Sequence, residues 1–250
     1  MAGYATARRG LHTHGARVVH FPLHSSYVGS TLEQTAVIPP ETPPRGRRPL
    51  LVLLHWRGGT PDMLLSNELF AGLAKLGSRA PLVVMPADDR DSFFHDRDDG
   101  RWAQYVVHEV IPAAVRRLGA DPSRVAIGGT SMGGFGALDI ARLWPGRFCA
   151  VGAHSPAIFT SDAASMAGSF DGPGDFARHD LLALHPSYGS TPLWIDVGTE
   201  DRFRAADVRL AGELGATAHV WPGKHGSRYW RAHMTSYLRF YADALARCGR

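Results

Sequence analysis

Cysteine is scarce and long apolar runs are absent, and each shortage excludes a class of protein. The only two cysteines among 250 residues, Cys149 and Cys248, lie far apart and match no metal-binding or redox spacing. Cys149 stands in an apolar run, where we expect a small buried side chain, so nothing calls for an oxidising compartment. No stretch approaches the roughly 20 apolar residues of a membrane-spanning helix, and the N-terminus lacks the apolar core of a secretory signal. The sequence therefore predicts a cytoplasmic protein without a membrane span.

The excess positive charge is confined to the N-terminal stretch. The net charge is +4, from 27 basic and 23 acidic residues. Residues 1–48 hold six arginines against two glutamates, whereas the rest of the chain is balanced. A nucleic-acid-binding surface needs basic residues clustered on the folded body, so we expect no nucleic-acid partner. With 44% hydrophobic and 20% charged residues the composition is that of a globular protein, and its length suits one domain.

Patterns typical of buried strands alternate with helical ones. Residues 1–16 read as a flexible lead, and 17–250 as a single domain that opens with an antiparallel pair of strands. After this pair, apolar runs that suit strands buried on both faces alternate with helical spacings, which predicts a mostly parallel, doubly wound α/β sheet. The predicted strands are 18–24, 31–38, 50–55, 81–86, 125–129, 150–154, 193–197 and 217–221. The predicted helices are 67–76, 102–118, 134–144, 203–214 and 228–247.

One connection is unusually long. Residues 155–190 are rich in Gly, Ser, Asp and Phe and link two predicted strands. Connections of this length are uncommon unless they serve a function. We expect this segment to form a small lid over a site.

The most specific motif is a Gly-x-Ser-x-Gly sequence around Ser131. Gly129, Ser131 and Gly133 follow a predicted strand and precede a predicted helix without a gap, which is the context that a nucleophile elbow requires. Small residues on both sides let the strand and helix approach closely, and the hydroxyl then stands clear of the backbone. The N–H of Met132 would point into the same space, where it favours a developing negative oxygen. The motif predicts Ser131 as nucleophile and Met132 as an oxyanion-hole donor.

Three segments around this motif resemble one known family. RVAIGGTSMGGFGALDIARLWPGRFCAVGAHSPAIF (124–159), WIDVGTEDRF (194–203) and PGKHGSRYWRAHM (222–234) are similar, in this order, to motifs of the esterase D-like branch of the α/β-hydrolase fold. This branch includes S-formylglutathione hydrolases, feruloyl-esterase domains and mycolyltransferases. The resemblance covers roughly residues 50–245. It implies an α/β-hydrolase fold, acyl transfer through a Ser-acid-His triad, and neither a metal nor an organic cofactor.

The base and the acid follow from chain order and position. A serine needs an adjacent base that a carboxylate orients, and in this fold the order is Ser, acid, His. His225 lies between the last strand and the closing helix, whereas His219 lies within a strand and His233 on the helix. Asp201 follows a strand in a turn, with Asp196, inside that strand, as the second choice. The predicted triad is Ser131, Asp201 and His225.

The second oxyanion donor is expected in the loop after the strand 50–55. This loop reads His55-Trp56-Arg57-Gly58-Gly59. The resembling families usually have glycine directly after the histidine, so Trp56 is a departure. The N–H of Arg57 is our choice and that of Trp56 the alternative, and a mere glycine-rich turn is also open.

Aromatic residues near the predicted loops could line an acyl or aryl pocket. The acidic loop 88–99 follows a strand but lacks the glutamate that a calcium loop has at its twelfth position, so we predict a solvated loop and no metal. Core packing explains the aromatic residues about as well as substrate binding. The candidate substrate-binding residues are Trp56, Phe93, Phe94, Trp102 and Phe170.

The predicted activity is hydrolysis of a small-molecule ester or thioester through a covalent acyl-enzyme. An acyltransferase would use the same triad, and a non-catalytic binding module could keep the same fold. Neither the acyl nor the alcohol portion of the substrate follows from the sequence. A homodimer is compatible with it.

Overall fold

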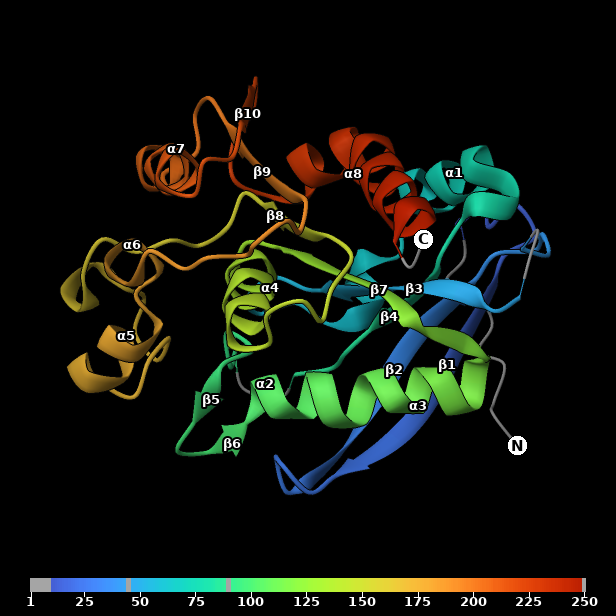
Figure 1. Cartoon of the computed structure of the whole chain (residues 1–250), viewed down its shortest axis with the longest axis horizontal. Coiled ribbons are helices and arrows are strands. Elements are labelled where there is room, and N and C mark those ends of the chain that lie inside the picture. Colours follow the sequence, from blue (N-terminus) through green and yellow to red (C-terminus); the bar gives the residue numbers. More distant parts are fainter. Residues whose placement is uncertain (1–9, 44–45, 89–90, 249–250) are drawn as a thin grey trace.

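The chain folds around one eight-stranded sheet with helices on both faces (Figure 1). In this computed structural model, residues 10–43, 46–88 and 91–248 are described. The strand order is β1-β2-β4-β3-β7-β8-β9-β10. Strand β2 pairs antiparallel with β1 and β4, and the other neighbouring strands pair parallel. The predicted doubly wound, mostly parallel sheet with N-terminal antiparallel strands is confirmed.

The elements lie close to their predicted positions. The strands of the main sheet are β1 (Arg17–Ser25), β2 (Ser30–Ile38), β3 (Arg48–Leu54), β4 (Leu82–Met85), β7 (Ala120–Thr130), β8 (Val151–His154), β9 (Leu193–Gly198) and β10 (Ala218–Trp221). The helices are α1 (Asn67–Leu76), α2 (Trp102–Tyr105), α3 (Ile111–Leu118), α4 (Met132–Leu143), α5 (Pro173–His179), α6 (Leu181–Leu184), α7 (Arg204–Glu213) and α8 (Ser227–Arg247). A π-helical turn, Val106–Val110, joins α2 to α3, so the predicted helix 102–118 is one continuous helical segment.

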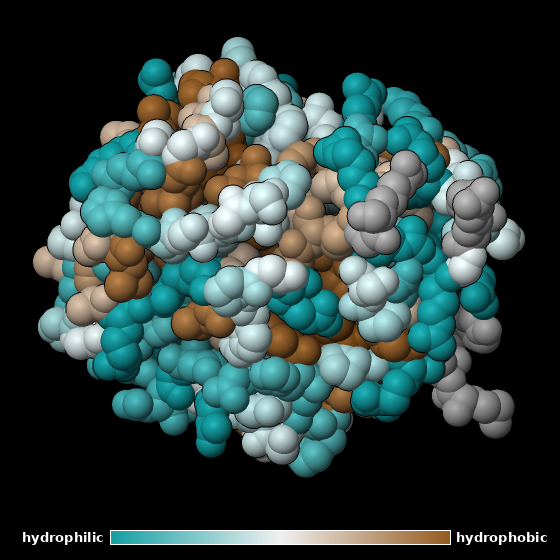
Figure 2. Space-filling view, in the orientation of Figure 1, coloured by the Kyte–Doolittle hydropathy of each residue, from teal (hydrophilic) through white to brown (hydrophobic). Residues whose placement is uncertain are grey.

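The alternation of side chains along the central strands explains the two layers of helices. In β3, Leu50, Val52 and Leu54 point to one face, and Leu51 and Leu53 point to the other. The first face packs against α2, α3, α4 and α7, and the second against α1 and α8. All seven residues of β3 are buried, as the continuous apolar run predicts. In the space-filling view, hydrophilic residues prevail over the lower part of the molecule, where α3 lies (Figure 2).

The insertion between β8 and β9 has its own short helices. Its residues, 155–190, contain α5 and α6 and lie beside α4 (Figure 1). The acidic loop before α2 adds a two-stranded hairpin, β5 (Asp96–Arg97) with β6 (Gly100–Arg101). The side chain of Arg97 binds Asp171 and the carbonyl oxygen of Gly168. These bonds join the hairpin to the insertion.

The two cysteines form a disulfide bond, which corrects the prediction that nothing calls for an oxidising compartment. Cys149 and Cys248 are bonded, with their Cα atoms 5.7 Å apart. Cys149 is buried as predicted, at 7% exposure, just before β8. Helix α8 crosses back over the sheet and ends beside Cys149. Both cysteines belong to the hydrophobic cluster beneath α1 and α8. Their separation in the sequence concealed this proximity, which only the path of α8 creates.

The predicted lead divides into two parts. Residues 1–9 lie outside the described residues. In the remainder, the N–H of His12 donates to Asn67 Oδ1 at 2.8 Å, and Leu11 packs against the cluster beneath α1 and α8. The segment 10–16 therefore contacts the start of α1.

Candidate active site

Ser131 occupies the sharp turn between β7 and α4. Its φ of 54° lies in the left-handed region that non-glycine residues rarely adopt. Its N–H donates to the carbonyl oxygen of His154 at 3.1 Å, which ties the turn to β8. A Cβ atom at Gly133 would collide with the carbonyl oxygen of Leu54, and one at Gly129 with the backbone of Gly133. Glycine is therefore needed at both positions, because strand and helix are in direct backbone contact at the turn.

The structure brings Ser131, His225 and Asp201 together in one chain of hydrogen bonds. The Nε2 atom of His225 lies 2.8 Å from Ser131 Oγ. Its Nδ1 atom lies 2.8 Å from Asp201 Oδ2. His225 comes from the loop between β10 and α8, and Asp201 from the turn after β9. The ring of His225 also packs edge-on against Phe203 and Trp230, with ring centroids 5.1 and 5.4 Å away. These contacts fix the imidazole between the hydroxyl and the carboxylate.

Hydrogen bonds keep Asp201 ionised despite its burial. Burial alone would raise the pKa of the Asp201 carboxyl, but hydrogen bonds from His225, Ser155 and the N–H of Phe203 together hold that pKa below its ordinary value. The Phe203 N–H donates to Oδ1 at 2.9 Å. A charged carboxylate at this position can stabilise an imidazolium at His225.

Asp196, the second choice for the acid, serves a different network. Its carboxylate accepts hydrogen bonds from Trp194 Nε1 and Tyr237 Oη, both at 2.8 Å, and lies 2.7 Å from His154 Nδ1. All these contacts lie within the sheet or against α8, and Asp196 is fully buried. The structure therefore places Asp196 in a structural role between β8, β9 and α8.

Ser155 is a member of the site that the sequence did not indicate. It directly follows β8, is fully buried, and has a left-handed φ of 52°. Its Oγ donates a hydrogen bond to Asp201 Oδ2 and lies 3.3 Å from His225 Nδ1. The only available signal was its place at the carboxyl end of a strand next to that of Ser131.

The two predicted oxyanion donors come from adjoining segments. Met132 is the first residue of α4, so its N–H has no acceptor within the helix. Arg57 lies in the turn after β3, whose end is in contact with Gly133. In that turn the Gly58 N–H donates to Asp91 Oδ1 at 2.6 Å and the Gly59 N–H to the carbonyl oxygen of Trp56 at 2.9 Å. The N–H groups of Trp56 and Arg57 belong to the same turn, so the first and the alternative choice for the second oxyanion donor both lie at the end of β3.

A groove of about 440 Å³ opens at Ser131. Trp56 lies in its wall beside Trp230, with ring centroids 5.2 Å apart. The described residues that line the groove are Trp56, Arg57, Met63, Ser131, Met166, Arg202, His225, Gly226, Ser227 and Trp230. Met166 comes from the insertion 155–190, so part of the predicted lid borders the site.

The structure does not bring the other four candidate substrate-binding residues to this groove. Phe93 and Phe94 are fully buried, Trp102 is 1% exposed and Phe170 8%. Phe93 packs on Phe170 at 6.0 Å between ring centroids. Phe93 and Phe94 each have a φ of 55°, and this backbone turns their side chains into the core beneath α4 rather than toward the solvent.

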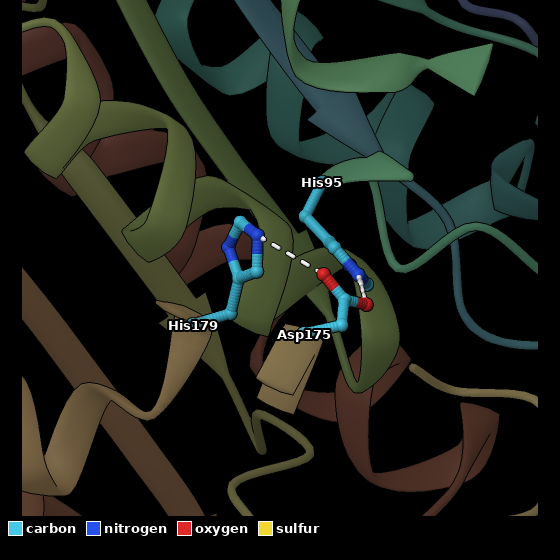
Figure 3. A group of neighbouring side chains, drawn as sticks. All are labelled: His95, Asp175 and His179. Atoms are coloured by element: carbon cyan, nitrogen blue, oxygen red, sulfur yellow. Dashed lines mark hydrogen bonds and ion pairs between the residues drawn. The ribbon is translucent and has the colours of Figure 1, made fainter. Parts of the chain in front are cut away.

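One cluster of the described residues has the composition of a metal site. His95, Asp175 and His179 offer ligand atoms within 4.8 Å of one another, and both imidazoles point toward the Asp175 carboxylate (Figure 3). That carboxylate already accepts hydrogen bonds from the Asp171 N–H at 2.9 Å and from Arg178 at 3.1 Å, and His95 Nε2 lies 3.0 Å from it. The cluster thus connects the acidic loop to α5 and holds the insertion against the body.

Comparisons with known proteins show which family the chain is similar to. The family model "Putative esterase" matches residues 25–241. The chain is 32% identical over 174 residues to an S-formylglutathione hydrolase of Paracoccus denitrificans, a match that covers 61% of this chain and 62% of that protein. The matched part therefore spans less than two thirds of that relative.

Solved structures share the fold over most of the chain. An S-formylglutathione hydrolase from Agrobacterium tumefaciens superposes with a TM-score of 0.75 at 21% identity, covering 92% of this chain and 96% of that one. A ferulic acid esterase superposes with a TM-score of 0.77 at 20% identity, covering 92% and 98%. No described helix is long and apolar enough to cross a membrane. The chain belongs to the esterase family of the α/β-hydrolase fold, in the esterase D-like branch that its three motifs resemble.

Proposed function

We propose that this protein hydrolyses a small-molecule ester or thioester through a covalent acyl-enzyme on Ser131. The observation that carries the proposal is the chain of hydrogen bonds from Ser131 Oγ through His225 to Asp201, with both contacts of the imidazole at 2.8 Å. A serine hydroxyl is a weak nucleophile until an adjacent base removes its proton, and that base must be oriented by a third group. Membership of the esterase family supports the same chemistry.

In the acylation step, Ser131 Oγ attacks the carbonyl carbon while its proton passes to His225 Nε2. Asp201 stabilises the resulting imidazolium and holds its Nδ1–H. The negative charge on the substrate oxygen is bound by the N–H groups of Met132 and of Arg57, near the N-terminus of α4. His225 then gives its proton to the departing oxygen or sulfur atom, and the bond from the carbonyl carbon to that atom breaks.

Deacylation repeats these steps with water. Water loses a proton to His225 Nε2 and attacks the acyl carbon, and the proton returns to Ser131 Oγ as the acid leaves. No residue in this cycle requires a metal or an organic cofactor. The relatives indicate a formylated thiol or a feruloyl ester as starting points for a substrate screen.

The test is turnover of p-nitrophenyl acetate by the purified chain and by Ser131→Ala. We expect the variant to lose about 10³-fold or more in kcat. The Ser66→Ala variant is a suitable control, because Ser66 Oγ caps α1 by accepting a hydrogen bond from the Leu69 N–H, outside the groove. Near wild-type turnover by Ser131→Ala would contradict the proposal.

The sequence and the disulfide bond indicate different cellular compartments. A cytoplasmic location is the prediction from the sequence, whereas disulfide bonds such as Cys149–Cys248 persist mainly in oxidising compartments. Alkylation of free thiols in freshly lysed cells, followed by mass analysis of the chain, distinguishes the two. Two alkylated cysteines support the cytoplasm, and none supports an oxidising compartment.

A further inference from the structure

Arginine side chains give the lining of the groove at Ser131 a positive charge. Among the ten described residues that line it, none is acidic and two are arginines. Arg57 is partly neutralised, because its Nε atom lies 3.4 Å from Asp91 Oδ2 and its guanidinium donates to the carbonyl oxygen of Ala167. Arg202 is different: its guanidinium lies 3.2 Å from Met166 Sδ and 4.7 Å from the Phe203 ring centre. Within the described part of the chain, Arg202 has no ion-pair partner.

Arg202 stands beside the reacting groups. It directly follows Asp201, and the Phe203 ring beneath its guanidinium packs against His225 at 5.1 Å between centroids. Neither the thioether of Met166 nor the ring of Phe203 carries a negative charge that would neutralise the guanidinium of Arg202. A substrate group that accepts two parallel N–H bonds, such as a carboxylate or a phosphate, would do so.

The start of α8 adds to the positive electrostatic potential of the same groove. Gly226 and Ser227, its N-cap and first residue, line the groove. This 21-residue helix has no side-chain cap and no acidic residue in its first turn. The positive end of its dipole is therefore not compensated from within the helix, and such an end favours anions.

A buried donor also lacks a partner. Trp230 is 4% exposed and lines the groove, and its indole N–H has no acceptor among the described residues. A buried N–H without an acceptor costs free energy. The guanidinium of Arg202 and the uncapped start of α8 therefore border the groove, and the unpaired indole belongs to a residue of its wall.

We propose that this groove selects esters or thioesters that carry a second, negatively charged group, which Arg202 binds at the start of α8. Trp56, Met63, Met166 and Trp230 supply apolar surface for the rest of that molecule. The inference rests on the proposed hydrolase function and names the class of its substrate.

The test compares matched probes that differ only in charge. For the acyl portion, p-nitrophenyl hydrogen adipate is compared with p-nitrophenyl hexanoate. For the thiol portion, S-acetyl-3-mercaptopropionate is compared with its methyl ester. The quantity measured is the ratio of kcat/KM for the charged and the neutral probe, in wild type and in Arg202→Gln. Dividing one ratio by the other removes the intrinsic reactivity of the probes.

We expect Arg202→Gln to lower this ratio about tenfold in at least one pair, as for the loss of a charge-assisted hydrogen-bonded pair. Arg202→Lys keeps the charge and should retain most of the ratio. Ser227→Asp places a negative charge at the helix start, where the dipole favours it, and should lower the ratio in the same pair. The control is Arg209→Gln on α7, since Arg209 is 58% exposed, pairs with Glu213 and does not line the groove.

The outcomes separate this inference from the proposed function. Turnover of the neutral probes with an unchanged ratio in Arg202→Gln and Ser227→Asp overturns the inference and leaves the hydrolase intact. Absence of turnover of all four probes by wild type, together with no fluorophosphonate labelling, overturns the proposed function and the inference with it.

Discussion

Ser155 Oγ donates a hydrogen bond to the same oxygen of Asp201 that faces His225 Nδ1. Both serines of the site, Ser131 and Ser155, have left-handed backbone conformations at the ends of neighbouring parallel strands. A non-glycine residue at such a positive φ costs about 1–3 kcal/mol, so the surrounding structure must hold it. The relationship indicates that Ser155 positions Asp201 for the proposed triad.

Replacing Ser155 by Ala should lower kcat about tenfold and leave KM nearly unchanged. The variant removes one of three hydrogen bonds to the Asp201 carboxylate, which raises the pKa of Asp201 and lets the acid turn away from His225. The measurement is the pair kcat and KM for p-nitrophenyl acetate. The matched control is Ser66→Ala, another buried serine, which should lose stability at α1 but keep kcat. Equal losses of kcat in both variants would assign Ser155 a merely structural role.

Asp201 and Asp196 should respond differently to the same substitution. Asp201→Asn removes the charge that stabilises the imidazolium and should slow acylation about 10³-fold or more. Asp196→Asn weakens the contacts to His154, Trp194 and Tyr237 and should cost about 1–3 kcal/mol of stability.

Urea unfolding and the rate of fluorophosphonate labelling measure the two effects of these aspartate variants separately. If Asp196→Asn abolished labelling in the folded protein and Asp201→Asn did not, Asp196 would be the acid.

Asp207 should make the protein less stable as the pH rises. It is fully buried on α7, its carboxyl oxygens have no partner among the described residues, and burial together with the nearby Asp201 and Asp196 raises its pKa well above the ordinary value. An acid whose pKa is raised by folding favours the folded state only below the pKa it has when unfolded. That contribution is lost as the pH rises, by about 1.4 kcal/mol per unit, until the folded pKa is reached.

Asp207→Asn removes this titration. The stability of the variant relative to wild type should therefore increase between about pH 4 and pH 7, as urea midpoints at several pH values would show. A difference that does not change with pH would mean that Asp207 is ionised in the folded protein.

Reduction of the disulfide should destabilise the chain without dismantling the site. Cys149 and Cys248 are 99 residues apart in the sequence. A cross-link that closes a loop of this length contributes about 2–5 kcal/mol to the free energy of unfolding. The Cys149→Ser, Cys248→Ser double variant should unfold at lower urea concentration and become insensitive to reductant. The same urea midpoint for the oxidised wild type and the double variant would contradict this prediction.

Local patterns were sufficient to predict the sheet, the order of elements and three residues that the structure brings together in the candidate site. Continuous apolar runs marked β3 and β4 because strands buried on both faces need no polar side. The elbow at Ser131 requires glycine at fixed spacings, and chain order then pointed to His225. Apart from the chain order, each of these signals lies in residues that are close together in the sequence.

The features that were not foreseen depend on segments far apart in the sequence. Ser155 reaches Asp201 only because β8 and β9 are neighbours in the sheet. Cys149 meets Cys248 only because α8 returns across the sheet. Phe93 and Phe94 turn inward through a backbone conformation that their sequence does not favour. Such relationships follow from the tertiary path, which periodicity and spacing do not contain.

The most direct test of the central claim is to find where a fluorophosphonate reacts. Intact-mass analysis should show one adduct per wild-type chain, and peptide mapping should place it on Ser131. Ser131→Ala should take up no label, and His225→Ala, which keeps the hydroxyl but lacks the base, should react far more slowly. An adduct mapped to another serine such as Ser155, or full labelling of Ser131→Ala, would contradict the account.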